Sequence, residues 1–165
     1  MTATSPCERE FRDAMGRFAT GLTVVTGMDG DEPVGFTCQS FVSVSLDPPL
    51  VSVCVMGTSR SWLRLRRSVG LCVHVLSDRQ ADLARRLAAP EGDRWAGVTW
   101  KLANNGAPLI EDTLLTVECS PVSELPAGDH ILVLCRVTLL RVPDSAADDA
   151  PLLFYRGRFH QLAAA

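Results

Sequence analysis

The sequence has no segment suited to crossing a membrane, because no run approaches the roughly 18 continuous apolar residues that a spanning helix needs. The N-terminus also lacks the apolar stretch after a basic start that a secretory signal peptide requires. The 16 basic residues do not outnumber the 19 acidic ones, so no basic excess indicates a nucleic-acid partner. These absences predict a cytoplasmic protein that binds neither membranes nor nucleic acid.

Paired cysteines are missing as well. The six cysteines form no C-x-x-C pair, and most of them lie among apolar neighbours. Free buried thiols behave as small hydrophobic side chains, so we expect neither a disulfide framework nor a zinc site. The sequence therefore predicts a reduced protein without a metal.

The common nucleotide and hydrolase motifs are absent too. No G-x-G-x-x-G follows a predicted strand, and neither G-x-x-x-x-G-K-[ST], H-E-x-x-H nor G-x-S-x-G occurs. A nucleotide bound by this protein is therefore not held in the Rossmann manner.

What the sequence does contain is a series of short β-branched segments. Strands are predicted at 22–28, 35–50 (ending at the paired proline 48–49), 50–56, 69–76, 114–122, 130–142 and 151–162. Helices are predicted to begin after Ser5, Ser59 and Ser77, where a hydroxyl precedes a helical apolar pattern. Residues 90–113 read as a long loop with one short strand at 98–102, and 143–150 as a surface connection.

The first predicted helix carries Phe11, Ala14, Met15 and Phe18 at helical spacing, which predicts one apolar face packed on the core. The length of 165 residues suits one domain covering residues 1–165. Many short strands and about three helices predict a mainly β fold, an antiparallel barrel with peripheral helices. Strands and helices do not alternate regularly, which excludes a doubly wound sheet.

The stretch Gly35–Leu50 is the first candidate site. Hydroxyl residues stand on both faces of this predicted strand, whereas an ordinary half-buried strand keeps one face apolar. Such a run can present short hydroxyls and main-chain N–H groups to a planar, polar-edged ligand with an anionic tail. The alternative is an edge strand that is simply rich in Ser and Thr.

Two shorter patterns add to it. Ser59 and Arg60 stand at a predicted strand-to-helix junction, which can bind an anion or can be an ordinary helix cap. His130 follows a Gly-Asp turn at the start of a strand, where it can bond a carboxamide or phosphate, or be only a turn residue. His74, inside an apolar strand, is predicted to be a structural histidine.

Five blocks in chain order together resemble the short-chain flavin reductases of two-component monooxygenases. They are FRDAMGRFATG (11–21), TVVT (23–26), GFTCQSFVSVSLDPPLV (35–51), GDH (128–130) and PLLFY (151–155). The resemblance covers nearly the whole chain, from about Phe11 to Leu162. It implies a Greek-key split β-barrel that binds FMN, or alternatively FAD, and works as a homodimer. It further implies that NADH, or alternatively NADPH, reduces the flavin, which then passes to a separate monooxygenase.

The resemblance also implies roles for individual residues. The flavin-binding strand falls on Thr37, Gln39, Ser40, Phe41, Val44 and Ser45, and the phosphate contacts fall on Ser59, Arg60 and, from the next helix, Arg86. His130 becomes the catalytic-site histidine that orients the nicotinamide, with Tyr155, Arg158 and Phe159 bordering the nicotinamide nucleotide. Because the nicotinamide donates hydride and the flavin accepts it, no general base is required.

Two residues depart from the family pattern. Gln39 replaces the usual Asn, and Leu87 replaces a Phe that forms an aromatic wall. Two other functions on the same barrel stay open at this point. One is a flavoprotein that keeps its flavin and acts directly on an organic substrate, and the other is a non-catalytic flavin-binding barrel.

Overall fold

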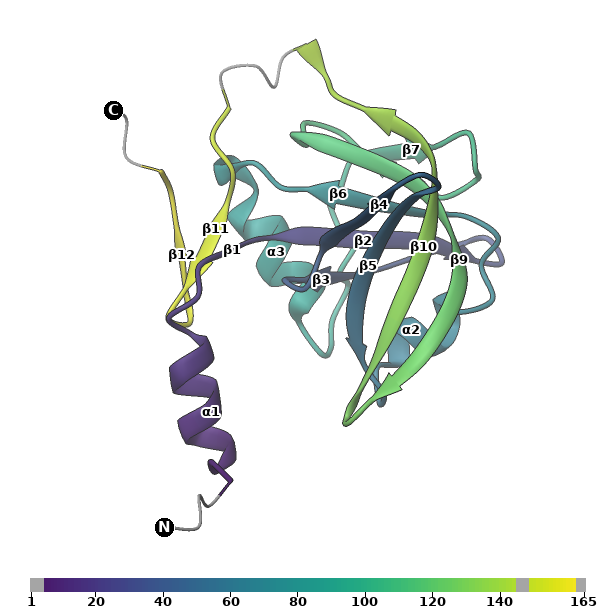
Figure 1. Cartoon of the computed structure of the whole chain (residues 1–165). Coiled ribbons are helices and arrows are strands. Elements are labelled where there is room, and N and C mark those ends of the chain that lie inside the picture. The colour runs from purple at the N-terminus through teal and green to yellow at the C-terminus, as the bar shows by residue number, and fades with distance from the viewer. Residues whose placement is uncertain (1–4, 145–148, 163–165) are drawn as a thin grey trace.

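The computed structural model describes residues 5–144 and 149–162, and Figure 1 labels most of the helices and strands. The helices are α1 (Glu8–Met15), α2 (Arg60–Leu65) and α3 (Ala81–Ala88), the last preceded by the 3-10 turn η1 (Asp78–Gln80). The strands are β1 (Thr20–Gly21), β2 (Thr23–Asp29), β3 (Glu32–Cys38), β4 (Val42–Leu46), β5 (Pro49–Met56), β6 (Leu71–Val75), β7 (Trp100–Leu102), β8 (Pro108–Ile110), β9 (Leu115–Ala127), β10 (His130–Arg141), β11 (Leu153–Tyr155) and β12 (Arg158–His160). None of the helices in the described ranges is long and apolar enough to span a bilayer.

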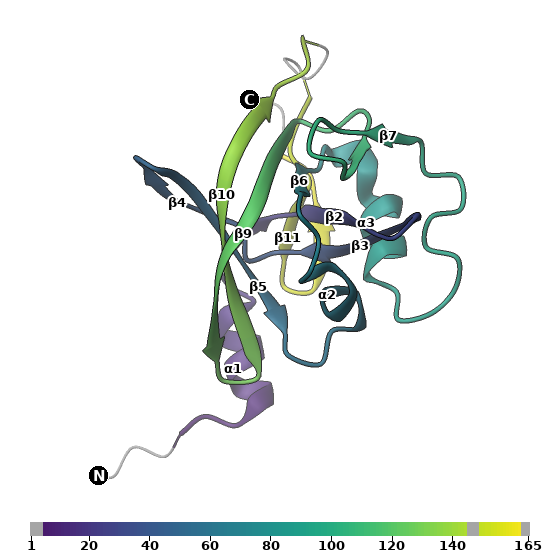
Figure 2. The same cartoon turned by 90° about the vertical axis from the view of Figure 1, so that its right-hand side faces the viewer.

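Seven strands form one antiparallel sheet in the order β3-β2-β6-β9-β10-β5-β4. The long hairpin β9–β10 lies in the middle of this order and runs across the body of the protein (Figure 1 and Figure 2). Smaller sheets join β1 to the hairpin β11–β12 and β7 to β8. The predicted mainly β fold class is confirmed.

The predicted strand at 35–50 is two strands, and they lie at opposite edges of the large sheet. β3 pairs with β2 and β4 pairs with β5, so the chain must leave one edge and join the other between them. Residues Gln39–Phe41, which we call the crossing segment, make this passage and belong to no strand. The sequence pattern missed the break because a β-branched, hydroxyl-rich run looks the same on either side of it.

The sheet separates two apolar cores because neighbouring residues of a strand point to opposite faces. Val25 of β2 belongs to the core that α2 covers with the buried side chains of Trp62 and Leu65. Val24, next to it, belongs to the core that α3 covers with Ala84 and Leu87. Helices α2 and α3 thus pack over opposite faces of the same strand, β2.

Helix α1 does not pack on the core, so that part of the sequence prediction is wrong. None of its residues is buried, and Phe11 and Met15 are 56% and 55% exposed. Figure 1 shows α1 standing away from the sheet. The helix also begins later than predicted, since its N-cap is Cys7 and not Ser5. The main-chain N–H of Cys7 donates to Glu10 Oε2 at 2.9 Å. The helical spacing of apolar residues was real, but the rest of the described chain offers no surface that covers it.

Two other segments differ from expectation because each contains a short hairpin. The predicted strand 151–162 is the hairpin β11–β12, which turns at Arg156 and Gly157 with positive φ angles of 48° and 76°. The predicted loop 90–113 holds the hairpin β7–β8. The predicted connection 143–150 lies partly outside the described residues. Short hairpins of this kind are missed because each strand is too brief for a period to register.

A buried polar network surrounds His74, which confirms its structural placement. Its Nε2–H donates to Pro108 O at 3.1 Å, and Thr116 Oγ1 donates to its Nδ1 at 3.0 Å. Thr26 Oγ1 donates to the same Pro108 carbonyl at 2.6 Å. Burial lowers the pKa of His74 to about 4 from its ordinary value of 6.5. The network fastens β8 to β6 with an uncharged imidazole.

The depressed pKa predicts a loss of stability in acid. A histidine that binds its proton less readily in the folded state costs nothing above pH 6.5, and its protonation favours unfolding as the pH falls towards 4. The contribution of His74 should therefore drop by about 3 kcal/mol over this window. Urea midpoints measured across the window should fall less steeply for His74→Gln than for the wild type. Equal slopes for the two proteins would contradict the assignment.

A buried ion pair joins β9 and β10. Arg141 Nε donates to Glu118 Oε1 at 2.7 Å, and Asn105 N donates to Glu118 Oε2 at 3.2 Å. The Glu118 side chain is 2% exposed, whereas that of Arg141 is 36% exposed. The carboxylate therefore depends on these two donors, and the guanidinium reaches it from the protein surface.

Candidate functional site

A cleft of about 870 Å³ opens where the crossing segment meets the end of β5, the start of α2 and the loop after α3. Six of the residues to which the sequence pointed line this cleft: Thr37, Gln39, Ser40, Ser59, Arg60 and His130. They come from three separate parts of the chain (37–40, 59–60 and 130), so the fold brings them together.

Two of the hydroxyls in the cleft are engaged in holding the fold. Thr37 Oγ1 donates to Ala84 O of α3 at 2.7 Å. Ser40 Oγ donates to Cys54 O at 3.0 Å and accepts from Cys54 N at 2.7 Å. Through Ser40 the crossing segment is joined to β5. The edge strands β3 and β4, between which it passes, are not paired with each other.

The groups that the crossing segment has left to meet a ligand are therefore main-chain donors and one side-chain amide. Within the described residues, no main-chain carbonyl accepts from the N–H groups of the crossing segment, and the Gln39 side chain has no hydrogen-bond partner. Gln39 is exposed. The crossing segment can thus offer N–H groups and a carboxamide to a polar ligand edge.

The Ser40 bridge leads to a stability prediction. Ser40→Ala should lower the free energy of unfolding by about 1–3 kcal/mol, because Cys54 N–H loses its acceptor in a partly buried place. Ser43→Ala, an exposed serine on β4, is the matched control and should change stability little. Urea unfolding of both variants gives the comparison, and an equal effect of the two substitutions would rule out the bridge.

Three arginines line the same cleft, and only one has carboxylate partners among the described residues. Arg64 donates to Asp29 and to Glu32, both at 2.6 Å, and these bonds raise its pKa. Arg60 donates instead to Pro90 O at 2.7 Å, and Arg94 donates to Ser61 Oγ at 3.1 Å. Sequence reasoning missed Arg94 because it lies in an irregular loop with no local pattern.

His130 stands at the rim of the cleft. Its Nδ1–H donates to Asp129 Oδ1 at 2.7 Å, which lowers the pKa of that carboxyl. Because a carboxylate only accepts, this bond fixes the ring and leaves Nε2 for a ligand. Gly128 adopts a φ of 67°, which suits a residue without a side chain at the turn before His130.

Gln39, Ser40 and His130 also line a second, larger hollow of about 1220 Å³. Its other walls include α1, Phe41 and the hairpin β11–β12, which contributes Phe154 and Arg156. His130 therefore lies between two adjoining spaces, as a residue would that meets two ligands at once.

The remaining predicted residues lie elsewhere. Tyr155, Arg158 and Phe159 belong to the hairpin that borders the second hollow, but their side chains are not part of its lining. Phe159 packs under Arg85, whose Cζ lies 4.8 Å from the ring centre. On β4, Val44 is 50% exposed, and neither it nor Ser45 lines either space.

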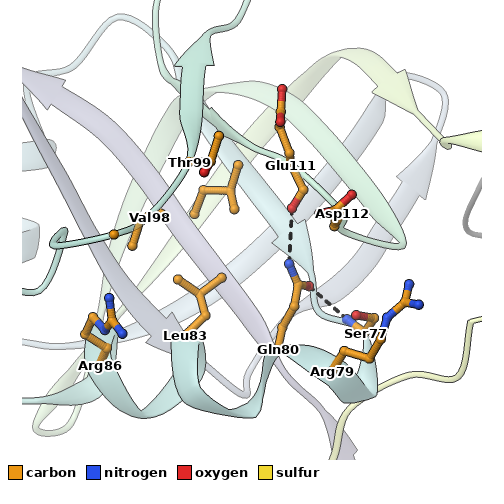
Figure 3. Close-up of a pocket in the computed structure, with 11 residues that line it drawn as sticks. Ser77, Arg79, Gln80, Leu83, Arg86, Val98, Thr99, Glu111 and Asp112 are labelled. Carbon is orange, nitrogen blue, oxygen red and sulfur yellow. Dashed lines mark hydrogen bonds between the residues drawn. The ribbon is translucent and has the colours of Figure 1, made fainter.

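Arg86 lines a separate pocket of about 510 Å³ beside α3, together with Leu83 and Gln80 (Figure 3). It donates a hydrogen bond to Ala96 O there. Gln80 is held in the same wall, because its side chain accepts from Ser77 N at 3.0 Å and donates to Glu111 O at 3.2 Å. The structure thus places Arg86 apart from the cleft that holds Arg60.

The donor set of the cleft fits a flavin. Flavins combine a flat apolar ring system, a polar ring edge and a phosphate tail. Phe36, Val55 and Met56 supply apolar wall, and the crossing segment supplies N–H groups. Arg60 supplies a guanidinium that has no carboxylate partner in the part of the chain that the structure describes. A mainly β protein with this cleft and an anchored histidine at its rim has the features of a flavin-dependent oxidoreductase.

The comparisons with known proteins agree. The family model described as "Flavin reductase like domain" matches residues 15–163, so the chain belongs to this family and is a flavin reductase. The family, enzyme class and general function predicted from the sequence are confirmed.

A relative from Mycobacterium tuberculosis, the reductase subunit HsaB of a flavin-dependent monooxygenase, is 43% identical over 152 residues, which cover 92% of this chain and 80% of that protein. An NADH:FMN oxidoreductase of Rhodococcus erythropolis is 37% identical over 161 residues, covering 96% of this chain and 84% of that one.

Solved structures give the same result. Component B of a nitrilotriacetate monooxygenase from Mycobacterium thermoresistibile matches with a TM-score of 0.91 and 37% identity, over 94% of this chain and 87% of that one. An NADH:FAD oxidoreductase of Streptomyces globisporus, solved with NAD and FAD fragments, matches with a TM-score of 0.88 and 36% identity, over 99% and 98% of the two chains.

Proposed function

We propose that this chain uses NADH to reduce FMN or FAD and releases the reduced flavin to a separate monooxygenase. The observation that carries this proposal is the position of His130 between the cleft and the second hollow, which gives flavin and nicotinamide adjoining places. The names of relatives support it, since they include both an NADH:FMN oxidoreductase and a monooxygenase reductase subunit. We further propose that residues 1–165 form one functional domain.

A bound flavin supplies the chemistry by accepting a hydride from the reduced nicotinamide. The protein's part is to hold the two rings in contact and to stabilise the charge that grows on the flavin edge. In this proposal the N–H groups of the crossing segment and the Gln39 amide serve the ring edge. Arg60 binds the phosphate, and His130 directs its Nε2 towards the nicotinamide.

We also propose that a second copy of the chain covers α1. Phe18, just beyond that helix, is 76% exposed, and it lines the second hollow together with Phe11 and Met15. Apolar side chains gathered in this way favour a protein partner. Sedimentation of the wild type should give a dimer, and Phe11→Glu should shift it towards the monomer. A monomeric wild type would refute the homodimer.

The experiment that tests the function is a steady-state assay of NADH oxidation with added free flavin. Saturation by free FMN or FAD as a second substrate is expected, because a diffusible-flavin reductase must take up and release its flavin. Turnover that does not depend on added flavin would instead indicate a flavoprotein that keeps its cofactor. No turnover with either NADH or NADPH would overturn the reductase proposal for this chain.

A further inference from the structure

Two guanidinium groups in the cleft have no counter-charge within the described part of the chain. The nine ion pairs of these residues include Arg64 but neither Arg60 nor Arg94. Glu91 and Asp93 lie close to Arg94 in sequence, but neither lines the cleft, and Asp93 Oδ1 accepts from Trp95 N at 3.1 Å. The cleft therefore carries two positive charges that an anionic ligand can balance.

Each of the two guanidinium groups bonds to the element that carries the other one. Arg60 reaches from α2 to the carbonyl of Pro90 in the loop after α3, while Arg94 reaches from that loop back to Ser61 of α2. Each of these bonds uses one of the five N–H donors of a guanidinium. Because Arg94 bonds to Ser61, the neighbour of Arg60, both arginines belong to the same side of the cleft, and within the described residues each has further N–H donors for a ligand.

The cleft continues between these two arginines over small apolar residues. Leu87, Ala88, Ala89 and Pro90 at the end of α3, together with Gly92, line it on the way to Arg94. These residues and Arg94 line the cleft in addition to Ser59 and Arg60. This side of the cleft therefore combines a second guanidinium group with small apolar residues, which suit a further phosphate and a purine ring.

We propose that Arg94 determines specificity for a flavin dinucleotide by binding the second phosphate of FAD. Arg60 binds the phosphate that FMN and FAD share, and the adenosine lies over the residues from Leu87 to Gly92. This assignment rests on the proposed function, because it concerns the flavin of the same cleft. A guanidinium on each side of a diphosphate can make charge-assisted hydrogen bonds to both phosphoryl groups.

The test compares three ligands on four proteins. Dissociation constants of riboflavin, FMN and FAD are measured by flavin fluorescence for the wild type, Arg94→Gln, Arg60→Gln and Arg67→Gln. Arg67 is exposed and does not line the cleft, so its variant controls for the loss of one positive charge. Losing a charge-assisted hydrogen bond should weaken binding about 10- to 100-fold.

The expected pattern is specific to each arginine. Arg94→Gln weakens the binding of FAD by that factor and leaves the affinities for FMN and riboflavin unchanged. Arg60→Gln weakens the binding of both FMN and FAD. Arg67→Gln changes none of the three affinities. If Arg94→Gln loses affinity for FMN and FAD equally, or for neither, the assignment of the second phosphate is overturned. Failure of the wild type to bind any of the three flavins overturns the proposed function itself.

A purely structural role for Arg94 is tested separately. Ser61→Ala removes the acceptor that Arg94 uses within the protein but keeps the guanidinium. FAD affinity is expected to be kept in Ser61→Ala and lost in Arg94→Gln. Equal losses of all three flavins in both variants, with matching falls in melting temperature, would show that Arg94 only fastens the loop to α2, and would refute the proposal.

Discussion

Replacing His130 with alanine is expected to lower kcat/KM for NADH about 10²-fold, because a reacting ring that is displaced by about 1 Å loses roughly that much rate. The Nδ1–H of His130 is fixed by Asp129 at 2.7 Å, so the imidazole is held in one orientation at the rim of the cleft. Hydride transfer needs no proton carrier, so the loss reflects positioning. Stopped-flow reduction of the flavin at varied NADH measures it directly.

The binding of oxidised flavin provides the control for this variant. His130→Ala should change the dissociation constant of FMN or FAD by less than about threefold, because the crossing segment and Arg60 hold the flavin in the proposed arrangement. Asp129→Asn keeps the imidazole but weakens its anchor, and it should lie between the wild type and His130→Ala. A large loss of flavin affinity with unchanged reduction rate would place His130 against the flavin tail instead.

The largest effect on stability is expected from Arg141→Met. Removing the guanidinium leaves the 2% exposed carboxylate of Glu118 without its cation, and breaking a buried pair in this way typically costs 3–5 kcal/mol. Because Arg141 is 36% exposed, water can replace part of its contribution. We therefore expect a loss near the lower limit, about 3 kcal/mol, measured by urea unfolding.

A double variant distinguishes the unpaired charge from simple loss of packing. Glu118→Gln combined with Arg141→Met removes the charge but keeps an amide carbonyl that can accept from Asn105 N. This protein should recover most of the stability that Arg141→Met loses. If the double variant is as unstable as the single one, the cost lies in the packing of the arginine stem and not in the buried carboxylate.

The strands and inner helices could be predicted from sequence because their signals are local. Ser59 was recognised as a cap, and its hydroxyl accepts from Trp62 N at 3.2 Å. Long β-branched runs such as that of β10 also gave their own signal. The predictions that were wrong share a cause, because they depended on contacts with segments far away in the sequence. The apolar face of α1 could be seen in the sequence, but not the absence of a core surface beneath it.

The same division applies to the site. The motif residues Gln39, Arg60 and His130 could be named in advance because the family resemblance carried them. That the hydroxyl of Ser40 closes the fold could not be predicted, since its partner Cys54 is reached only through the tertiary structure. Arg94 was missed for a related reason, because its position across from Ser61 is set by the path of an irregular loop.

The crossing segment has a consequence for the order of assembly. Its three residues join strands that are consecutive in the chain but terminal in a sheet whose middle is the hairpin β9–β10. Pairing of such distant segments is the slow part of folding for β proteins. A nascent chain that has emerged only as far as β5 therefore holds every residue of the crossing segment but lacks the β6, β9 and β10 strands that complete the sheet between its two ends. In the proposed arrangement, flavin binding therefore has to follow the synthesis of β10, and we expect no flavin binding by a chain that ends at β5.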